Sequence, residues 1–166
     1  MDRVSTRRST VLLVILCLWG AVACLSSDPV AEIQLLGQDV VRRIDEMRPE
    51  VSLWNRDSLK SQSHQLAYWP AGGIRFDVQK TDSLVHPLVG FVEFDCAGDS
   101  YEWGFLKVHI TYGRTPGGAW SYQGIEYHVR RSGWQVSETS LDLARIASEA
   151  AADFQQKRKG QGREGA

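Results

Sequence analysis

Cys24 is the residue whose position most clearly indicates chemistry, because its thiol directly follows the small residues Ala21-Val22-Ala23. Arginines stand near the start of the chain, and an apolar run then extends from Val11 to Trp19. A basic start, a short apolar stretch and small residues before a cleavage point are typical of an export signal. We therefore interpret residues 1–23 as a signal peptide that is cleaved after Ala23.

The segment Ala21-Val22-Ala23-Cys24 resembles the lipobox of bacterial lipoproteins, in which small residues stand directly before a cysteine. The resemblance implies that the Cys24 sulfur is lipidated with palmitate-type chains and that residues 24–28 tether the protein to a membrane. Two or three acyl chains give a stable anchor, whereas one chain is marginal. Ala21-x-Ala23 also fits ordinary secretory cleavage, so a soluble protein beginning at Cys24 is the alternative.

The same segment bears on localisation. The apolar run from Val11 to Ala23 is well short of the roughly 20 residues that a membrane-spanning helix needs, so no permanent span is expected. We expect a protein of the cell envelope, lipid-anchored and facing the periplasm or the exterior. Leu25 is not the Asp that signals inner-membrane retention in enteric-type sorting, which favours the outer membrane. Secretion as a soluble protein is the alternative.

Lipidation also determines which thiols are left. Cys17 leaves with the signal, so lipidation of Cys24 would make Cys96 the only remaining thiol. An unmodified Cys24 could instead form a disulfide with Cys96 in an oxidising compartment. Because Cys96 ends a predicted strand and has no nearby His or Lys to lower its pKa, we interpret it as a buried structural thiol.

The charge distribution argues against a nucleic-acid partner. Removing residues 1–23 changes the formal net charge from −1 to −3, and no clustered basic face is evident. The last residues differ, because Lys157, Arg158, Lys159 and Arg163 lie among Gly and Gln without a large apolar residue. We predict a disordered basic tail over residues 156–166 and one α+β domain over residues 29–155.

Asp28-Pro29 predicts the start of a helix, because an acidic N-cap precedes a proline at the first helical position. Pro49 ends this helix, and its apolar residues recur at spacings of three and four on one stripe. They are Val30, Ile33, Leu36, Val40, Ile44 and Met47. A second helix begins at the capping box of Thr139 and Asp142, with Leu143, Ala147, Ala150 and Phe154 on one side.

From Ile74 onward, apolar and polar residues alternate as a half-buried strand requires. Strands are predicted near residues 74–78, 88–96, 101–113, 120–131 and 134–138. Turn residues separate the last four, so these should pair as hairpins. Residues 50–73 are irregular and predict no element. The predicted fold is α+β: an N-terminal helix, a curved antiparallel sheet of about five strands in a meander, and a C-terminal helix.

Residues from about 74 to 138, which end in Tyr127-His128-Val129 and Gly133-Trp134, resemble the curved antiparallel sheet of NTF2-like and cystatin-like domains. The resemblance implies a helix wrapped over a curved sheet, an arrangement that often leaves a pocket. It transfers no functional residue to this chain and does not by itself assign a function.

Hairpin geometry predicts which side chains share a face. Symmetric closure of the loop at 114–119 places Gly113 opposite Trp120, and therefore Lys107 opposite Glu126. A single-residue bulge would reverse this parity. In this register, a group of mostly aromatic side chains lies on the sheet face away from the predicted core, with Val92 and Phe94 beside it. We call this group the candidate ligand face. The candidate ligand face consists of Trp103, Phe105, His109, Trp120, Tyr122 and His128.

Two interpretations of the candidate ligand face remain open. Either the N-terminal helix or the segment from Trp54 to Trp69 covers these aromatic side chains, or they line a concave pocket with a few polar groups. No metal site, cofactor or catalytic residue is predicted. Metal sites need three or four convergent ligands, whereas the four histidines are isolated along the sequence at positions 64, 86, 109 and 128.

Two functions are compatible with these observations. The first is a membrane-anchored extracytoplasmic lipoprotein that acts by interaction or ligand binding without catalysis. The second is an NTF2-like small-molecule-binding protein or enzyme, with a pocket on the candidate ligand face and His109 or His128 as a polar group. The lipobox, the short tether and the lack of a catalytic constellation favour the first.

Overall fold

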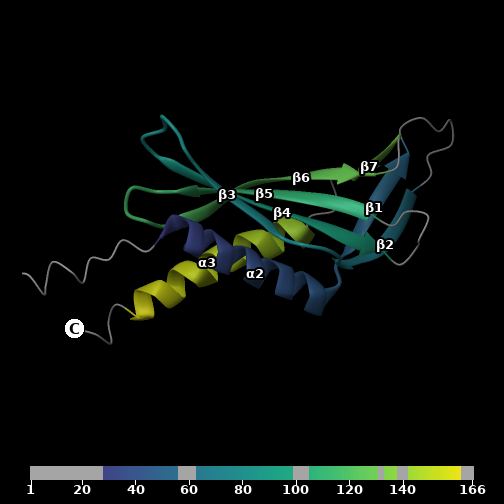
Figure 1. Ribbon diagram of the computed structural model, residues 1–166. Helices are drawn as coiled ribbons and strands as arrows, with labels where there is room; N and C mark the ends of the chain where they lie inside the picture. Colours follow the sequence, from purple (N-terminus) through teal and green to yellow (C-terminus); the bar gives the residue numbers. More distant parts are fainter. Residues whose placement is uncertain (1–27, 56–62, 99–104, 131–132, 138–141, 162–166) are drawn as a thin grey trace, which may run out of the picture.

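The computed structural model describes residues 28–55, 63–98, 105–130, 133–137 and 142–161. Helices α2 (Pro29–Met47) and α3 (Asp142–Gln161) lie side by side over one face of an antiparallel sheet (Figure 1). The strands are β1 (Glu50–Asn55), β2 (Ser63–Pro70), β3 (Arg75–Lys80), β4 (Leu88–Gly98), β5 (Phe105–Arg114), β6 (Trp120–Val129) and β7 (Trp134–Val136). The predictions for Ala23, Cys24, Trp103 and Thr139 fall outside the described residues.

Helix α2 begins and ends as its sequence predicts. The Asp28 carboxylate accepts a hydrogen bond of 3.0 Å from the Val30 N–H, which satisfies one of the amides left unpaired at a helix start. Arg48 ends the helix in the left-handed conformation and donates its N–H to the Ile44 carbonyl. The central stripe is fully buried and comprises Ile33, Leu36, Val40 and Ile44.

Helix α3 corrects the predicted C-terminal boundary. Leu143, Ala147 and Ala150 are buried as expected, but the helix continues to Gln161. The predicted disorder from residue 156 is therefore wrong for residues 156–161. The reason is tertiary, because Arg158 donates to the Gly118 carbonyl at 2.9 Å and forms an ion pair with Glu32. Low hydrophobicity predicted disorder, but two partners distant in sequence hold the last turns of the helix.

The sheet follows the order β6-β5-β4-β2-β1-β7, and β3 pairs with the first part of β4, on the same edge that β2 joins further along. Strands β3 to β6 pair consecutively, as the predicted meander requires. The predicted fifth strand differs, because β7 pairs with β1 instead of β6. The unassigned segment supplies the two further strands, β1 and β2, which pair with each other. Strand β7 also contacts β6, so the sheet nearly closes on itself.

The pairing of β5 with β6 contains an irregularity that the symmetric hairpin did not predict. Ile110 lies opposite Ile125, but Tyr112 lies opposite Tyr122, so β6 carries one more residue than β5 between these pairs. Such a bulge reverses the side-chain parity beyond it. The loop also closes with Trp120 opposite Arg114 instead of Gly113, and beyond the bulge Lys107 lies opposite His128 instead of Glu126.

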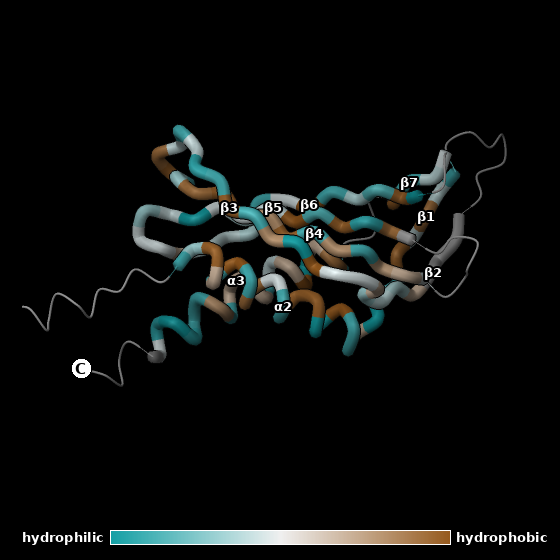
Figure 2. The backbone as a smooth tube through the Cα atoms, in the orientation of Figure 1, coloured by the Kyte–Doolittle hydropathy of each residue, from teal (hydrophilic) through white to brown (hydrophobic). Residues whose placement is uncertain are grey.

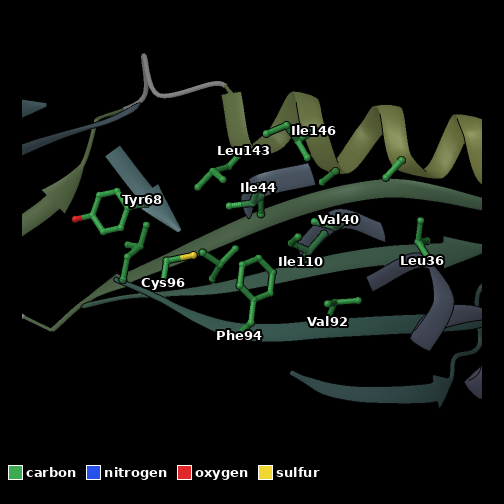
Figure 3. Packing of buried hydrophobic residues seen from close by; sticks show 14 of the residues in the cluster. Leu36, Val40, Ile44, Tyr68, Val92, Phe94, Cys96, Ile110, Leu143 and Ile146 are labelled. Atoms are coloured by element: carbon green, nitrogen blue, oxygen red, sulfur yellow. The ribbon is translucent and has the colours of Figure 1, made fainter. Parts of the chain in front are cut away.

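The core fills the space between the helices and the sheet. Figure 3 shows Leu36, Val40 and Ile44 of α2 and Leu143 and Ile146 of α3 above a row of strand side chains. The labelled strand residues are Tyr68, Val92, Phe94, Cys96 and Ile110, all at most 2% exposed. Apolar segments accordingly lie where the helices meet the sheet in Figure 2. Both helices thus lie on the same face of the sheet, and no described helix lies on the other face.

Candidate functional site

The sheet face opposite the helices is polar, and we call it the open face. Alternation along each strand produces it, because every second residue points away from the core. Arg75 and Asp77 of β3 face Glu93 and Phe91 of β4, and Glu93 faces His109 of β5. Lys107 with His128, and His109 with Glu126, extend this face across β5 and β6.

A groove with a volume of about 390 Å³ lies on the open face. Arg75, Asp77 and Gln79 form one side of it, and Phe91, Glu93 and His109 line the remainder. The Phe91 and His109 rings lie 5.2 Å apart between centroids, at an angle of 40°. The groove therefore combines charges of both signs with an aromatic surface.

Glu93 is the central charge of the groove. Its Oε1 lies 3.0 Å from Arg75 and 3.3 Å from Lys107, and its Oε2 lies 3.9 Å from His109 Nδ1. Partial burial acts to raise the pKa of Glu93, but the Lys107 hydrogen bond and the nearby cationic charges lower it overall. Glu93 is consequently ionised at neutral pH and holds the surrounding cationic side chains in place.

Asp77 adds an acidic group with fixed orientation. One of its oxygens accepts the Val78 N–H at 2.9 Å, and the other accepts Gln79 Nε2 at 2.7 Å. Arg75 remains 77% exposed in its side chain. The groove therefore presents an exposed cationic group beside a fixed carboxylate, which suits binding through charge and hydrogen bonds.

Of the candidate ligand face, only part lies on the open face. His109 lines the groove, His128 is exposed opposite Lys107, and Phe105 begins β5 opposite Ala97. Trp103 is outside the described residues. The predicted grouping of Trp120 and Tyr122 with the histidines is wrong, because the bulge turns both rings toward the helices.

The prediction that Val92 and Phe94 lie on the face away from the core is also wrong. They lie opposite Ile110 and Val108 and are buried beneath the helices. The prediction that a helix covers aromatic residues of the sheet therefore holds for Phe94, Trp120 and Tyr122, which pack in the core. The charged neighbours of His109, by contrast, were missed as a site. The alternation of Arg75, Asp77 and Gln79 along one strand indicates that these side chains share a face. Only the pairing of β3 with β4 shows that this face continues to Glu93.

A second polar cluster lies at the end of the molecule where α2 begins. The Glu32 carboxylate, 5% exposed, binds Arg114 Nε at 3.0 Å and Arg158 at 2.6 Å. It also accepts the Trp120 indole N–H at 2.8 Å. Arg114 additionally lies over the Trp120 ring, 5.8 Å from its centroid. Trp120 is thus a structural residue that joins the β5–β6 hairpin to both helices.

No protein-family model matches this chain, and no curated protein or solved structure is significantly similar to it.

Within the described ranges, no group of three or more His, Cys, Asp or Glu side chains is arranged to hold a metal ion. Neither of the two described helices has an apolar stretch long enough to cross a membrane.

Cys96 is a free thiol with no exposed surface, as the structural interpretation expects. Burial, with a contribution from the charge of Asp95, raises the pKa of the Cys96 thiol to about 12. At neutral pH this sulfur is therefore neither a nucleophile nor readily accessible to another thiol.

Proposed function

We propose that this protein is a lipid-anchored protein of the cell envelope that acts by binding, with the groove on the open face as its binding surface. The observation that carries the anchor is the lipobox-like segment Ala21-Val22-Ala23-Cys24, and only a short stretch of chain separates Cys24 from the helix start at Asp28. Four residues of extended chain span at most about 14 Å. Such a tether holds the folded domain close to the lipid headgroups.

The groove supports binding in preference to catalysis. Glu93 is neutralised by cationic side chains, and Cys96 is buried on the other face of β4. The described residues around the groove therefore supply charge pairing and an aromatic contact but no activated nucleophile.

The packing of the core disfavours a ligand cavity between helix and sheet, which the second hypothesis requires. Trp120 is 2% exposed, Tyr112 is fully buried, and the Tyr112 hydroxyl donates to the Ala147 carbonyl of α3 at 3.2 Å. These side chains fill space between the sheet and the helices. Binding is accordingly assigned to the open face.

Metabolic labelling with palmitate tests the anchor in the native host. We expect the wild-type protein to carry the label and to sediment with membranes, and Cys24→Ala to lose both properties. Cys96→Ala is the matched control, because its thiol is buried, and it should remain labelled. A Cys24→Ala protein that stays lipidated would refute the anchor. A wild-type protein whose intact mass shows an unmodified or disulfide-bonded Cys24 would refute it equally and would support secretion.

The groove is tested separately by nuclear magnetic resonance with a library of small zwitterionic and aromatic fragments. We expect fragments to shift the His109 ring signals and to lose this effect in Phe91→Ala. The His86 ring, which packs against Gly113 outside the groove, is the internal control. Equal shifts of both rings, or no shift at all, would remove the groove as a binding surface.

A further inference from the structure

The loop between β3 and β4 exposes two apolar side chains at its tip. Leu84 is 91% exposed and Val85 is 64% exposed, more than any other large apolar side chain in the described residues. The tip of this loop carries the apolar colour of Figure 2 and projects from the sheet. Exposed apolar groups at a projecting tip indicate a contact with another apolar phase.

Hydrogen bonds fix the shape that turns these two side chains outward. The Thr81 N–H donates to the Pro87 carbonyl at 3.0 Å, which closes the base of the loop. The Thr81 hydroxyl donates to the His86 carbonyl, and the His86 N–H donates to the Ser83 hydroxyl at 3.1 Å. Polar groups thus form the inside of the loop, and the apolar tip is presented without any rearrangement.

The loop lies at the end of the molecule where the tether enters. Lys80 and Leu88, which flank the loop, pair with each other, and Leu88 also lies opposite Arg114. Arg114 binds Glu32 in the first turn of α2. The loop, the start of α2 and the end of α3 are accordingly found together at the left of Figure 1.

We propose that Leu84 and Val85 insert into the headgroup and acyl boundary of the membrane that carries the lipidated Cys24. This inference rests on the proposed lipid anchor, because the short tether is what brings this end of the domain to the bilayer. Lys80, Lys157 and Lys159 are exposed at the same end and suit anionic headgroups. Insertion of the tip would orient the domain, with the sheet extending away from the membrane and the groove accessible from the side.

Electron paramagnetic resonance on the full lipidated protein tests this orientation. A spin label is attached at Leu84→Cys, and the protein is reconstituted into vesicles of phosphatidylethanolamine and phosphatidylglycerol. The matched control is Gln135→Cys, an exposed position of β7 at the opposite end of the molecule. The buried Cys96 should not be labelled. We expect collisions with oxygen to exceed collisions with a water-soluble nickel chelate at position 84, and the reverse at position 135.

The outcomes separate the two proposals. A protein that sediments with the vesicles while both labels remain in water would overturn the insertion and leave the anchor intact. A protein without lipid on Cys24, which does not sediment, would overturn the anchor. As a second measurement, Leu84→Ser with Val85→Ser should retain lipidation and the unfolding midpoint but increase the rotational mobility of a label at position 135.

Discussion

Glu32 shows how a single buried charge determines local order at a distance. Its carboxylate lies in the first turn of α2, yet its partners include Arg114 of β5, Trp120 of β6 and Arg158 of α3. The carboxylate is 5% exposed, whereas Arg158 is 36% exposed. A buried carboxylate is tolerated only when it is paired, so these elements have to meet at this point.

Glu32→Gln is expected to lower the free energy of unfolding by about 3 kcal/mol, because two arginines lose their counter-charge in a low-dielectric setting. The control is Glu46→Gln on the same helix, which breaks an ion pair with Arg42 whose side chains are more than half exposed. Its cost should be at most about 0.5 kcal/mol. Urea denaturation followed by circular dichroism measures both. Equal losses would show that the Glu32 cluster contributes no more than a surface pair.

At the scale of elements, two glycines allow α2 to lie close to the sheet. At Gly90 of β4, an added Cβ would lie 2.7 Å from Ile33 Cδ1 and 2.9 Å from the Trp120 ring. Gly37 of α2 has a similar relation to β3 and β4, because its Cβ would meet Phe76 and Val92. At each of these two contacts a glycine on one element therefore makes room for side chains that reach it from other elements.

Gly90→Ala is expected to destabilise the protein by about 1–3 kcal/mol, the usual cost of overpacking a tight contact. Gly124→Ala on β6 is the matched control, because nothing lies within 4 Å of its added Cβ. That variant should stay within about 0.5 kcal/mol of wild type. Thermal unfolding of the two variants makes the comparison, and similar midpoints would contradict the close packing of Ile33 and Trp120 on β4.

At the scale of the whole molecule, burial of weak acids links stability to pH. Burial raises the pKa of Tyr68 to about 12 and, with the charge of Asp95, that of Cys96 to about 12. Burial also raises the pKa of Tyr112 and of Tyr127. In the unfolded chain these groups ionise at their ordinary values, 9.0 for the thiol and 10.0 for the phenols.

The stabilisation from these groups is fully present below about pH 9 and is lost as the pH rises toward 12, because the unfolded state then releases protons that the folded state retains. We expect the unfolding temperature to fall over this interval. The unfolding temperature of the Tyr68→Phe variant should fall less steeply with pH, because the substitution removes one of the buried ionisable groups. Calorimetry at a series of pH values tests this, and parallel curves for the two proteins would show that Tyr68 ionises equally in both states.

Sequence by itself determined the elements whose signals are local. The Asp28-Pro29 cap and the 3–4 spacing defined α2, and alternation defined the strands from β3 to β6. It also determined that His109 faces away from the core. These features depend on neighbours within a few residues, so the pattern of side chains carries them.

Only the tertiary structure decided the rest. The bulge near Tyr112 turned Trp120 toward the helices, β7 paired with β1, and Arg158 ordered the last turns of α3. An extra residue in a strand leaves no clear local mark, and it is fixed here by partners far away in the chain, above all the buried carboxylate of Glu32. The groove belongs to this second class, because Arg75, Glu93 and His109 become neighbours only when three strands align.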